Sequence, residues 1–297
     1  MAEWLKAPVL KTDESRGSQG SNPCPSATFH PASVNLVCLV TQSCEQYTLE
    51  ILHLDDYLIF VHKPAGLLVH PSWITPPGEV TLVGLLKTQF PEETIHTVHR
   101  LDRATSGVMV FARNKEVAQS LQQMFRDRLV CKTYLCVTRG WTEPRGVIDY
   151  ALKPEYDKFA DPLANPDKAP KEAVTHFRQL ACVELPIAVG RYPVARYSLV
   201  EVKPLTGRKH QIRRHMKHIF HPLVGDTKHG EGRHNRLFRE HFGCHRLLLM
   251  AIRLELAHPV TGQHLSITAH PGHEIDALFA ELGWPEVVER EYGEKRQ

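Results

Sequence analysis

The pattern of apolar and polar residues changes near residue 48. The stretch from Lys11 to Ala27 is rich in Ser, Gly, Pro and Asn and has no apolar period, which is typical of disordered chain. From Thr48 onward, short apolar runs alternate with turn residues, beginning with a half-buried strand predicted over Thr48–His53. The same reasoning predicts further strands over residues 58–61, 107–112, 133–137, 175–180, 197–204, 247–256 and 263–269.

Helical spacing is rarer than strand spacing in this chain. Asn114 is a good N-cap, and it precedes an apolar stripe formed by Val117, Leu121, Met124 and Phe125. A basic helix is predicted at about 207–218, with Ile212, Met216 and Ile219 facing inward, and a closing helix at 274–282. Residues 153–173 are rich in Pro, Asp and Lys and predict a surface loop. Meandering strands with few helices favour an α+β fold with a mixed, largely antiparallel sheet and flanking helices.

Three segments follow from this pattern: a disordered leader over 1–48, one folded domain over 49–285 and a C-terminal tail over 286–297. The leader has a further peculiarity. Ala2–Lys6 can be encoded by a D-arm-like sequence of a tRNA gene, and Gly20–Pro23 by a T-arm-like sequence. We therefore interpret the leader as a gene-calling artefact, with the native start near Thr48 or Leu49. Detection of a peptide from residues 1–30 in the source organism would refute this interpretation.

The composition is that of an ordinary globular protein, with 297 residues of which 42% are hydrophobic and 23% are charged. No apolar run approaches the length of a bilayer span, and the first residues lack the layout of a signal peptide. Seven cysteines in no framework spacing favour reduced thiols, and hence a cytoplasmic protein.

Positive charge is concentrated in one part of the chain. The formal net charge is only +3, yet residues 203–253 hold twelve Lys or Arg against three Asp or Glu, together with eight of the nineteen His residues. Such a concentration is the expected footprint of contact with a phosphate backbone. A solvated basic face is the alternative.

One short motif stands out, His99-Arg100-Leu101-Asp102-Arg103-Ala104-Thr105-Ser106-Gly107. Cations on both sides of Asp102 favour its ionised form, which suits a nucleophile or base in a site that binds a polyanion. The alternative is a loop salt bridge of purely structural value. A kinase is excluded, because the chain has neither a Gly-rich phosphate loop nor Asp-Phe-Gly.

The His-Arg-Leu-Asp-x-x-Thr-Ser-Gly run resembles the active-site motif of the RluA-type pseudouridine synthases. The resemblance covers residues 48–285 and includes, in the family's order, Lys63–Gly66, Lys132–Tyr134, Thr206–His215 and His221–Asp226. The family's optional N-terminal S4-type RNA-binding domain is not evident. Finer features resemble the members that modify position 65 in the T-stem of tRNA; these are His70-x-Ser72-Trp73, Gly190–Pro193, Gly207–Gln211 and Lys228–Gly230.

The resemblance implies an isomerase that turns a uridine in RNA into pseudouridine without a cofactor. Asp102 would be the catalytic residue and Arg213 its ion-pair partner, with Arg208 a less favoured substitute. Arg100 would fill the gap left by the flipped base, Tyr134 would stack on the uracil and serve as base, and Ile212 would line the pocket. The predicted RNA-binding residues are Arg100, Arg103, Arg208, Lys209, Ile212, Arg214, Lys217 and Lys228. We expect a monomer that binds tRNA, with no protein partner implied and no membrane contact.

Several alternatives stay open at this stage. Asp102 could attack C1′, attack C6 or start an elimination. The substrate could be ribosomal RNA, or the chain could be a non-catalytic RNA-binding module. No metal is expected, although His210, His215, His218 and His221 lie close in sequence, because neither His-Glu-x-x-His nor Cys-x-x-Cys occurs.

Overall fold

The computed structural model describes residues 49–71, 76, 78–155, 168–285 and 287–292, so the predicted leader lies outside the described residues. The strands are β1 Glu50–Leu54, β2 Leu58–Lys63, β3 His96–Thr97, β4 Ser106–Ala112, β5 Cys131–Arg139, β6 Arg145–Asp149, β7 Val174–Leu185, β8 Ala195–Pro204, β9 Leu249–Ala257 and β10 His264–Thr268. The helices are α1 Leu82–Gln89, α2 Lys115–Arg126, α3 Gln211–His218, α4 Gly232–Phe242, α5 His273–Glu281 and α6 Val287–Tyr292. No helix in these ranges is long and apolar enough to cross a membrane.

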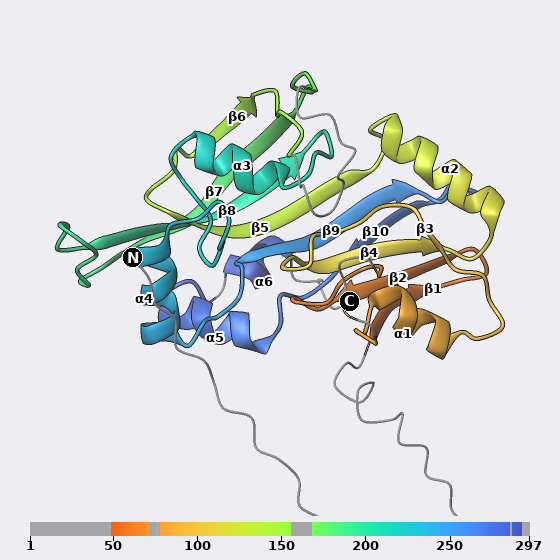
Figure 1. Cartoon of the computed structure of the whole chain (residues 1–297), viewed down its shortest axis with the longest axis horizontal. Coiled ribbons are helices and arrows are strands. Elements are labelled where there is room, and N and C mark those ends of the chain that lie inside the picture. Colours follow the sequence, from red (N-terminus) through yellow and green to blue (C-terminus); the bar gives the residue numbers. More distant parts are fainter. Residues whose placement is uncertain (1–48, 72–75, 77, 156–167, 286, 293–297) are drawn as a thin grey trace, which may run out of the picture. The chain divides into compact units, whose positions relative to one another are not determined.

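The strands form one sheet in the order β1-β2-β4-β9-β5-β8-β7-β6, with β3 beside β4 and β10 beside β9 (Figure 1). Neighbouring strands in the described ranges pair antiparallel, except β4 and β9, which pair in parallel through Ser106↔Met250 and Gly107↔Ala251. The predicted α+β fold with a mixed, largely antiparallel sheet is confirmed.

Gly107 makes the parallel junction possible. Its φ is +119°, and a Cβ at this position would lie 2.0 Å from the backbone oxygen of Ala251. Any other residue would therefore clash with the neighbouring strand and strain its own backbone. The junction lies five residues after Asp102, so this close approach fixes the end of the Asp102 loop.

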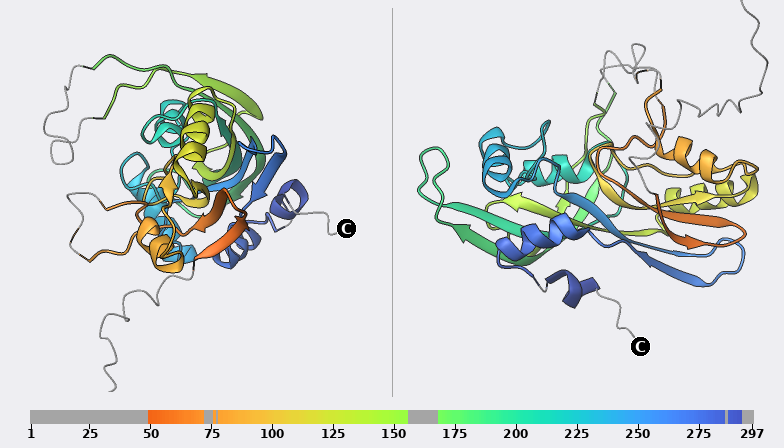
Figure 2. Two further views of the ribbon diagram at one scale, coloured as in Figure 1. Left: turned by 90° about the vertical axis from the view of Figure 1, so that its right-hand side faces the viewer. Right: turned by 90° about the horizontal axis from the view of Figure 1, so that it is seen from below.

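Alternating residues of the central strands face two different sides of the sheet. In β4, Met109 and Phe111 pack with α1, whereas Val108 and Val110 pack with α2. In β9, Leu249 packs with α3, whereas Met250 packs with α5 and α6. Helices α1 and α3 therefore share one face of the sheet, and α5 and α6 lie on the other, as the views in Figure 2 show.

The predictions that rest on a helix cap or an apolar stripe agree with the structure. Asn114 caps α2 by accepting a hydrogen bond from the Val117 amide at 2.9 Å. The stripe of α3 is also confirmed, because Ile212 and Met216 are buried and Ile219 is partly buried. Helices α1 and α4 and strand β6 were not predicted, since their periodicity is weak or interrupted by polar residues.

Two predicted boundaries are wrong. The basic helix begins at Gln211 rather than at 207, because Gln211 Oε1 accepts hydrogen bonds from the Thr206 hydroxyl and the Arg208 amide and so shapes a loop. Ordered structure also continues past residue 285, where a tail was expected. Helix α6 follows there, and its Tyr292 is buried and donates a hydrogen bond to Glu201 at 2.5 Å.

Candidate active site

Asp102 lies in the loop between β3 and β4, on the face of the sheet shared by α1 and α3. Leu101 is buried in the apolar cluster around α1, and Ala104 packs against the cluster around α3. The loop therefore runs between two parts of the core, and the buried residues on either side of Asp102 hold it in place. The Asp102 side chain keeps 26% of its surface exposed, so it can meet a substrate.

His99, the first residue of the motif, has a structural role. Its Nε2 accepts a hydrogen bond from the Val110 amide at 3.1 Å, and its ring stacks on Phe125 with centroids 4.7 Å apart. Burial lowers the pKa of His99 to about 3, so the ring is neutral and remains an acceptor. It ties the start of the loop to β4.

Arg213 joins Asp102 to a second, buried carboxylate. Its Nη1 donates to Asp102 Oδ2 at 3.1 Å, while Nε and Nη2 donate to Asp226 at 2.6 and 2.8 Å. Burial alone would lower the pKa of Arg213, but the hydrogen bonds and charges of Asp226 and Asp102 raise it, so the guanidinium stays charged. The expected pairing of Asp102 with Arg213 is thus present in the geometry, and Asp226 holds the guanidinium in place.

Lys63 was missed as a site residue, although its motif was noted. Its ammonium group is buried and donates to the carbonyls of Pro64, Leu67 and Arg103 at 2.7, 2.8 and 3.2 Å. Burial lowers its pKa to about 7, and the nearby Arg246 lowers it as well, while Asp102 opposes the shift. Lys63 therefore ties the Asp102 loop to the end of β2. A lysine beside Pro and Gly was the only sequence signal.

Tyr134 of β5 lies on the same face, in contact with the apolar clusters of both α1 and α3. The pairing of β5 with β9 shifts register between Thr133 and Tyr134, and such bulges re-aim side chains next to active sites. Burial raises the pKa of the Tyr134 phenol, and the Asp102 charge raises it further. The tyrosine is therefore within electrostatic range of Asp102.

Several of the predicted RNA-binding residues make contacts within the protein. Arg208 donates to the Glu172 carbonyl at 2.9 Å rather than to Asp102, so it is not a substitute for Arg213. Arg103 pairs with Glu79 at 2.7 Å, Lys228 pairs with Glu155 at 2.7 Å, and Arg214 donates to the Lys153 carbonyl at 2.8 Å. Ile212 is buried in the core cluster beside α3. Arg100, Lys209 and Lys217 are exposed, and so are Arg103 and Lys228 despite their ion pairs.

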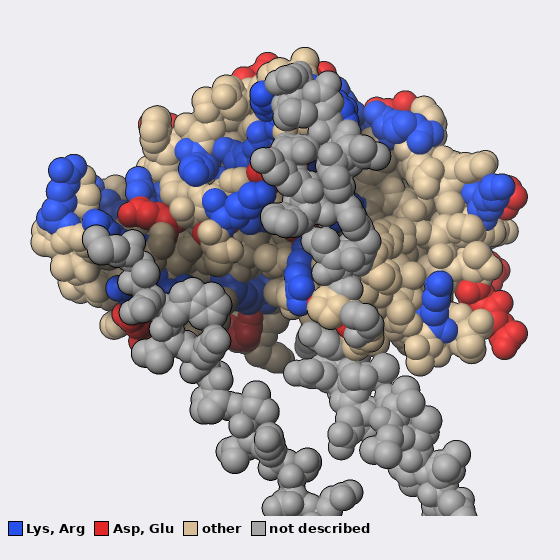
Figure 3. Space-filling model, in the orientation of Figure 1, with Lys and Arg blue, Asp and Glu red and all other residues tan. Residues whose placement is uncertain are grey.

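Basic side chains gather on the face that carries the site. Figure 3 shows Lys and Arg side chains over and around α3. Since α3 supplies Arg213 to the site, this basic surface adjoins Asp102 and suits a polyanionic substrate.

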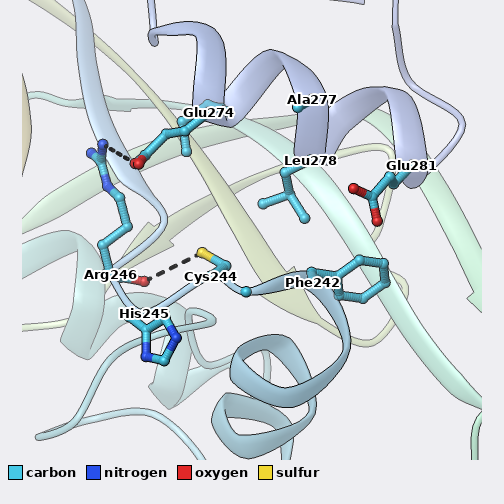
Figure 4. A pocket seen from close by; sticks show the side chains of 10 residues that line it. Phe242, Cys244, His245, Arg246, Glu274, Ala277, Leu278 and Glu281 are labelled. Atoms are coloured by element: carbon cyan, nitrogen blue, oxygen red, sulfur yellow. Dashed lines mark hydrogen bonds and ion pairs between the residues drawn. The ribbon is translucent and has the colours of Figure 1, made fainter.

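A hollow elsewhere contains none of the predicted catalytic residues. It is lined by the end of α4, by the segment after it with Cys244 and Arg246, and by α5 with Glu274 (Figure 4). Arg246 donates to Glu274 at 3.0 Å and to the Ser106 hydroxyl at 2.5 Å, so it braces the start of β4.

The family comparison agrees with this geometry. The family model described as RNA pseudouridylate synthase matches residues 57–218. A tRNA pseudouridine synthase C from Vibrio parahaemolyticus is 48% identical over 238 residues, which is 80% of this chain and 96% of that protein. A protein of the same name from Pectobacterium carotovorum is 50% identical over 240 residues, 81% of this chain, but the match spans only 64% of its length.

Solved structures show the same fold. Human RNA Pseudouridylate Synthase Domain Containing 4 matches with a TM-score of 0.59 at 26% identity, covering 79% of this chain and 93% of that one. Human RNA Pseudouridylate Synthase Domain Containing 1 matches with a TM-score of 0.58 at 28% identity, covering 75% and 83% of the two chains.

Proposed function

The chain belongs to the RNA pseudouridylate synthase family, and on that premise we propose that it converts the uridine at position 65, in the T-stem of tRNA, to pseudouridine. The names of the bacterial relatives support tRNA as the substrate. The observation that carries the proposal is the Asp102–Arg213–Asp226 arrangement beside a basic surface. The described cysteines, Cys131, Cys136, Cys182 and Cys244, are free thiols, which supports a place in the reducing cytoplasm.

The chemistry requires one carboxylate oxygen that is free to react. The bond between N1 and C1′ breaks, the base turns over, and a new bond forms between C5 and C1′. C5 then loses its proton, and N1 gains a proton. Arg213 and His210 both approach Oδ2 of Asp102, at 3.1 and 3.7 Å. Oδ1 is therefore the oxygen that attacks C1′ or C6, or that removes a proton to start elimination.

The paired uridine must leave the helix before Asp102 can reach it. Arg100 is exposed and lies two residues from Asp102, so it is placed to fill the gap left in the RNA. Arg103 is a weaker candidate, because Glu79 and the Gly66 carbonyl hold its guanidinium.

Tyr134→Phe should separate stacking from proton transfer. The ring remains, so tRNA affinity should hold, whereas loss of the hydroxyl should slow the final step by roughly 10²–10⁴-fold if it acts as general base. Because the pKa of Tyr134 is raised, the protonated phenol dominates at neutral pH, and the wild-type step should accelerate as pH rises. Single-turnover rates across pH provide the measurement. A variant with wild-type rates and pH profile would exclude the hydroxyl as the base.

Affinity for tRNA should fall steeply with salt, because Lys and Arg around α3 would each displace a counterion. Lys217→Ala should reduce the slope of log K against log salt by roughly 0.7–0.9. Lys115→Ala, an exposed lysine at the start of α2, is the matched control and should leave the slope unchanged. If the two variants have equal slopes of log K against log salt, the RNA does not bind at the surface around α3.

A minihelix made of the T-arm and acceptor stem should remain a substrate. The basic surface around α3 adjoins the site directly, so contacts with the anticodon arm are not required. Tritium release from 5-tritiated uridine and mapping of the product would test this. If only ribosomal fragments or the anticodon stem-loop are modified, the assignment to position 65 is wrong, although membership of the family stands.

A further inference from the structure

Three side chains distant in sequence meet beside Asp102. They are Glu155, in the segment after β6, His210, at the start of α3, and His229, in the loop before α4. His210 Nδ1 lies 3.0 Å from Glu155 Oε2 and 3.0 Å from His229 Nε2, and His229 Nε2 lies 3.2 Å from Glu155 Oε1. His210 has a φ of +54°, a left-handed conformation that is uncommon for a residue other than glycine.

Hydrogen bonds can join at most two of the three sides of this triangle. Its three edges join two ring nitrogens and a carboxylate. With the histidines as the only donors, each ring nitrogen brings at most one hydrogen and the carboxylate none, so one edge always lacks a proton. A single cation at the centre would satisfy all three groups together.

The spacing and chemistry fit zinc. Zinc binds His nitrogen and carboxylate oxygen at about 2.0–2.2 Å, and tetrahedral geometry then puts the ligand atoms about 3.4 Å apart. The two nitrogens lie 3.0 Å apart, and each lies 3.0 or 3.2 Å from a different oxygen of Glu155, so a small outward shift of the three side chains would admit the ion between them.

The surrounding charge also accommodates a cation. Three carboxylates, those of Asp102, Glu155 and Asp226, face two permanent cations, Arg213 and Lys228. Lys228 Nζ lies 2.7 Å from Glu155 Oε2 on a side chain that is 52% exposed. Its ammonium group therefore already balances Glu155 and can swing into solvent when a metal binds.

We propose that Glu155, His210 and His229 form a zinc site that inhibits the enzyme. A metal on Nδ1 of His210 leaves the ring proton on Nε2, which lies 3.7 Å from Asp102 Oδ2. A carboxylate that accepts a hydrogen bond from a metal-bound histidine is a common arrangement around zinc, and a shift of about 0.5–1 Å would bring the two atoms within that range. The metal-bound imidazole, a stronger donor to Oδ2, would draw negative charge from the carboxylate and so make Oδ1 a weaker nucleophile and base. The inhibition rests on the proposed function, whereas the binding does not.

Binding can be measured directly on the full chain, with reduced thiols and after removal of metals by EDTA. Calorimetric titration with Zn²⁺ should show one site. His229→Gln and Glu155→Gln should each weaken it by at least about tenfold. Lys228→Ala should tighten it, because the competing ammonium is gone. His264→Gln, an exposed histidine on β10, is the matched control and should bind like the wild type. Thermal unfolding of each variant checks that it is folded.

X-ray absorption of the zinc complex identifies the ligands. Nitrogen and oxygen at about 2.0–2.2 Å are expected, and sulfur at about 2.3 Å would place the ion on cysteines instead. The site is refuted by sulfur ligands, by the absence of a single zinc site, or by unchanged affinity in His229→Gln.

Activity assays then test the inhibition. Zinc at saturating concentration should suppress tritium release by the wild type, and EDTA should restore it. The His229→Gln variant should release tritium at the same rate with and without this concentration of zinc. Zinc that binds at this site without slowing the wild type would refute the inhibitory role. An enzyme without activity on any RNA would instead refute the proposed function and leave the binding result standing.

Discussion

Asp102→Asn should abolish isomerisation while tRNA affinity stays within about tenfold, because phosphate contacts supply most of the affinity. The carboxamide has nearly the same shape and can still accept a hydrogen bond from Arg213 through its oxygen. It is neither a nucleophile nor a base, so turnover should fall by at least about 10⁴-fold, the scale seen when a covalent catalyst loses its nucleophile. Tritium release and equilibrium binding measure the two effects separately.

Asp56→Asn is a suitable control, since Asp56 is an exposed carboxylate in the turn before β2. It should leave both activity and affinity unchanged. Near-normal turnover of Asp102→Asn would remove the aspartate from the mechanism and favour a non-catalytic RNA-binding protein.

Arg213→Gln should damage both stability and catalysis. The Asp226 side chain is 0% exposed, and the glutamine would leave its carboxylate buried without a counter-charge. Breaking such a buried pair costs about 3–5 kcal/mol, which urea unfolding would detect. Arg213→Lys should not restore stability, because lysine cannot reproduce the two parallel hydrogen bonds to Asp226.

Two further variants separate these effects. Arg214→Gln, the next residue of α3, should change stability by no more than about 0.5–1 kcal/mol. Combining Arg213→Gln with Asp226→Asn removes the unpaired charge, so stability should partly return while activity stays low. Recovery of activity in that double variant would show that Arg213 serves only the fold.

The sequence predicted best what depends on local pattern. Val117, Leu121 and the cap at Asn114 lie within one helix, so their spacing was sufficient to predict it. The motif around Asp102 and its partner Arg213 could be paired only through the family resemblance, because 111 residues separate them.

The parts of the site that the sequence could not predict depend on tertiary contacts. Asp226 holds Arg213 from a loop, Lys63 reaches three carbonyls, and Glu155 meets two histidines. No periodicity links such residues, since their proximity arises from the order of strands in the sheet.

The parallel pairing of β4 with β9 also affects how the protein folds during its synthesis. The pairing joins Ser106 to Met250, so it can form only after most of the chain has emerged from the ribosome. Contacts so distant in sequence slow folding, because a long loop must close before the pairing yields any stabilisation. The Asp102 loop ends at this junction. A nascent chain truncated before β9 would therefore carry the catalytic motif without a stable catalytic centre, and the emerging enzyme would be inactive on RNA until its last strands are in place.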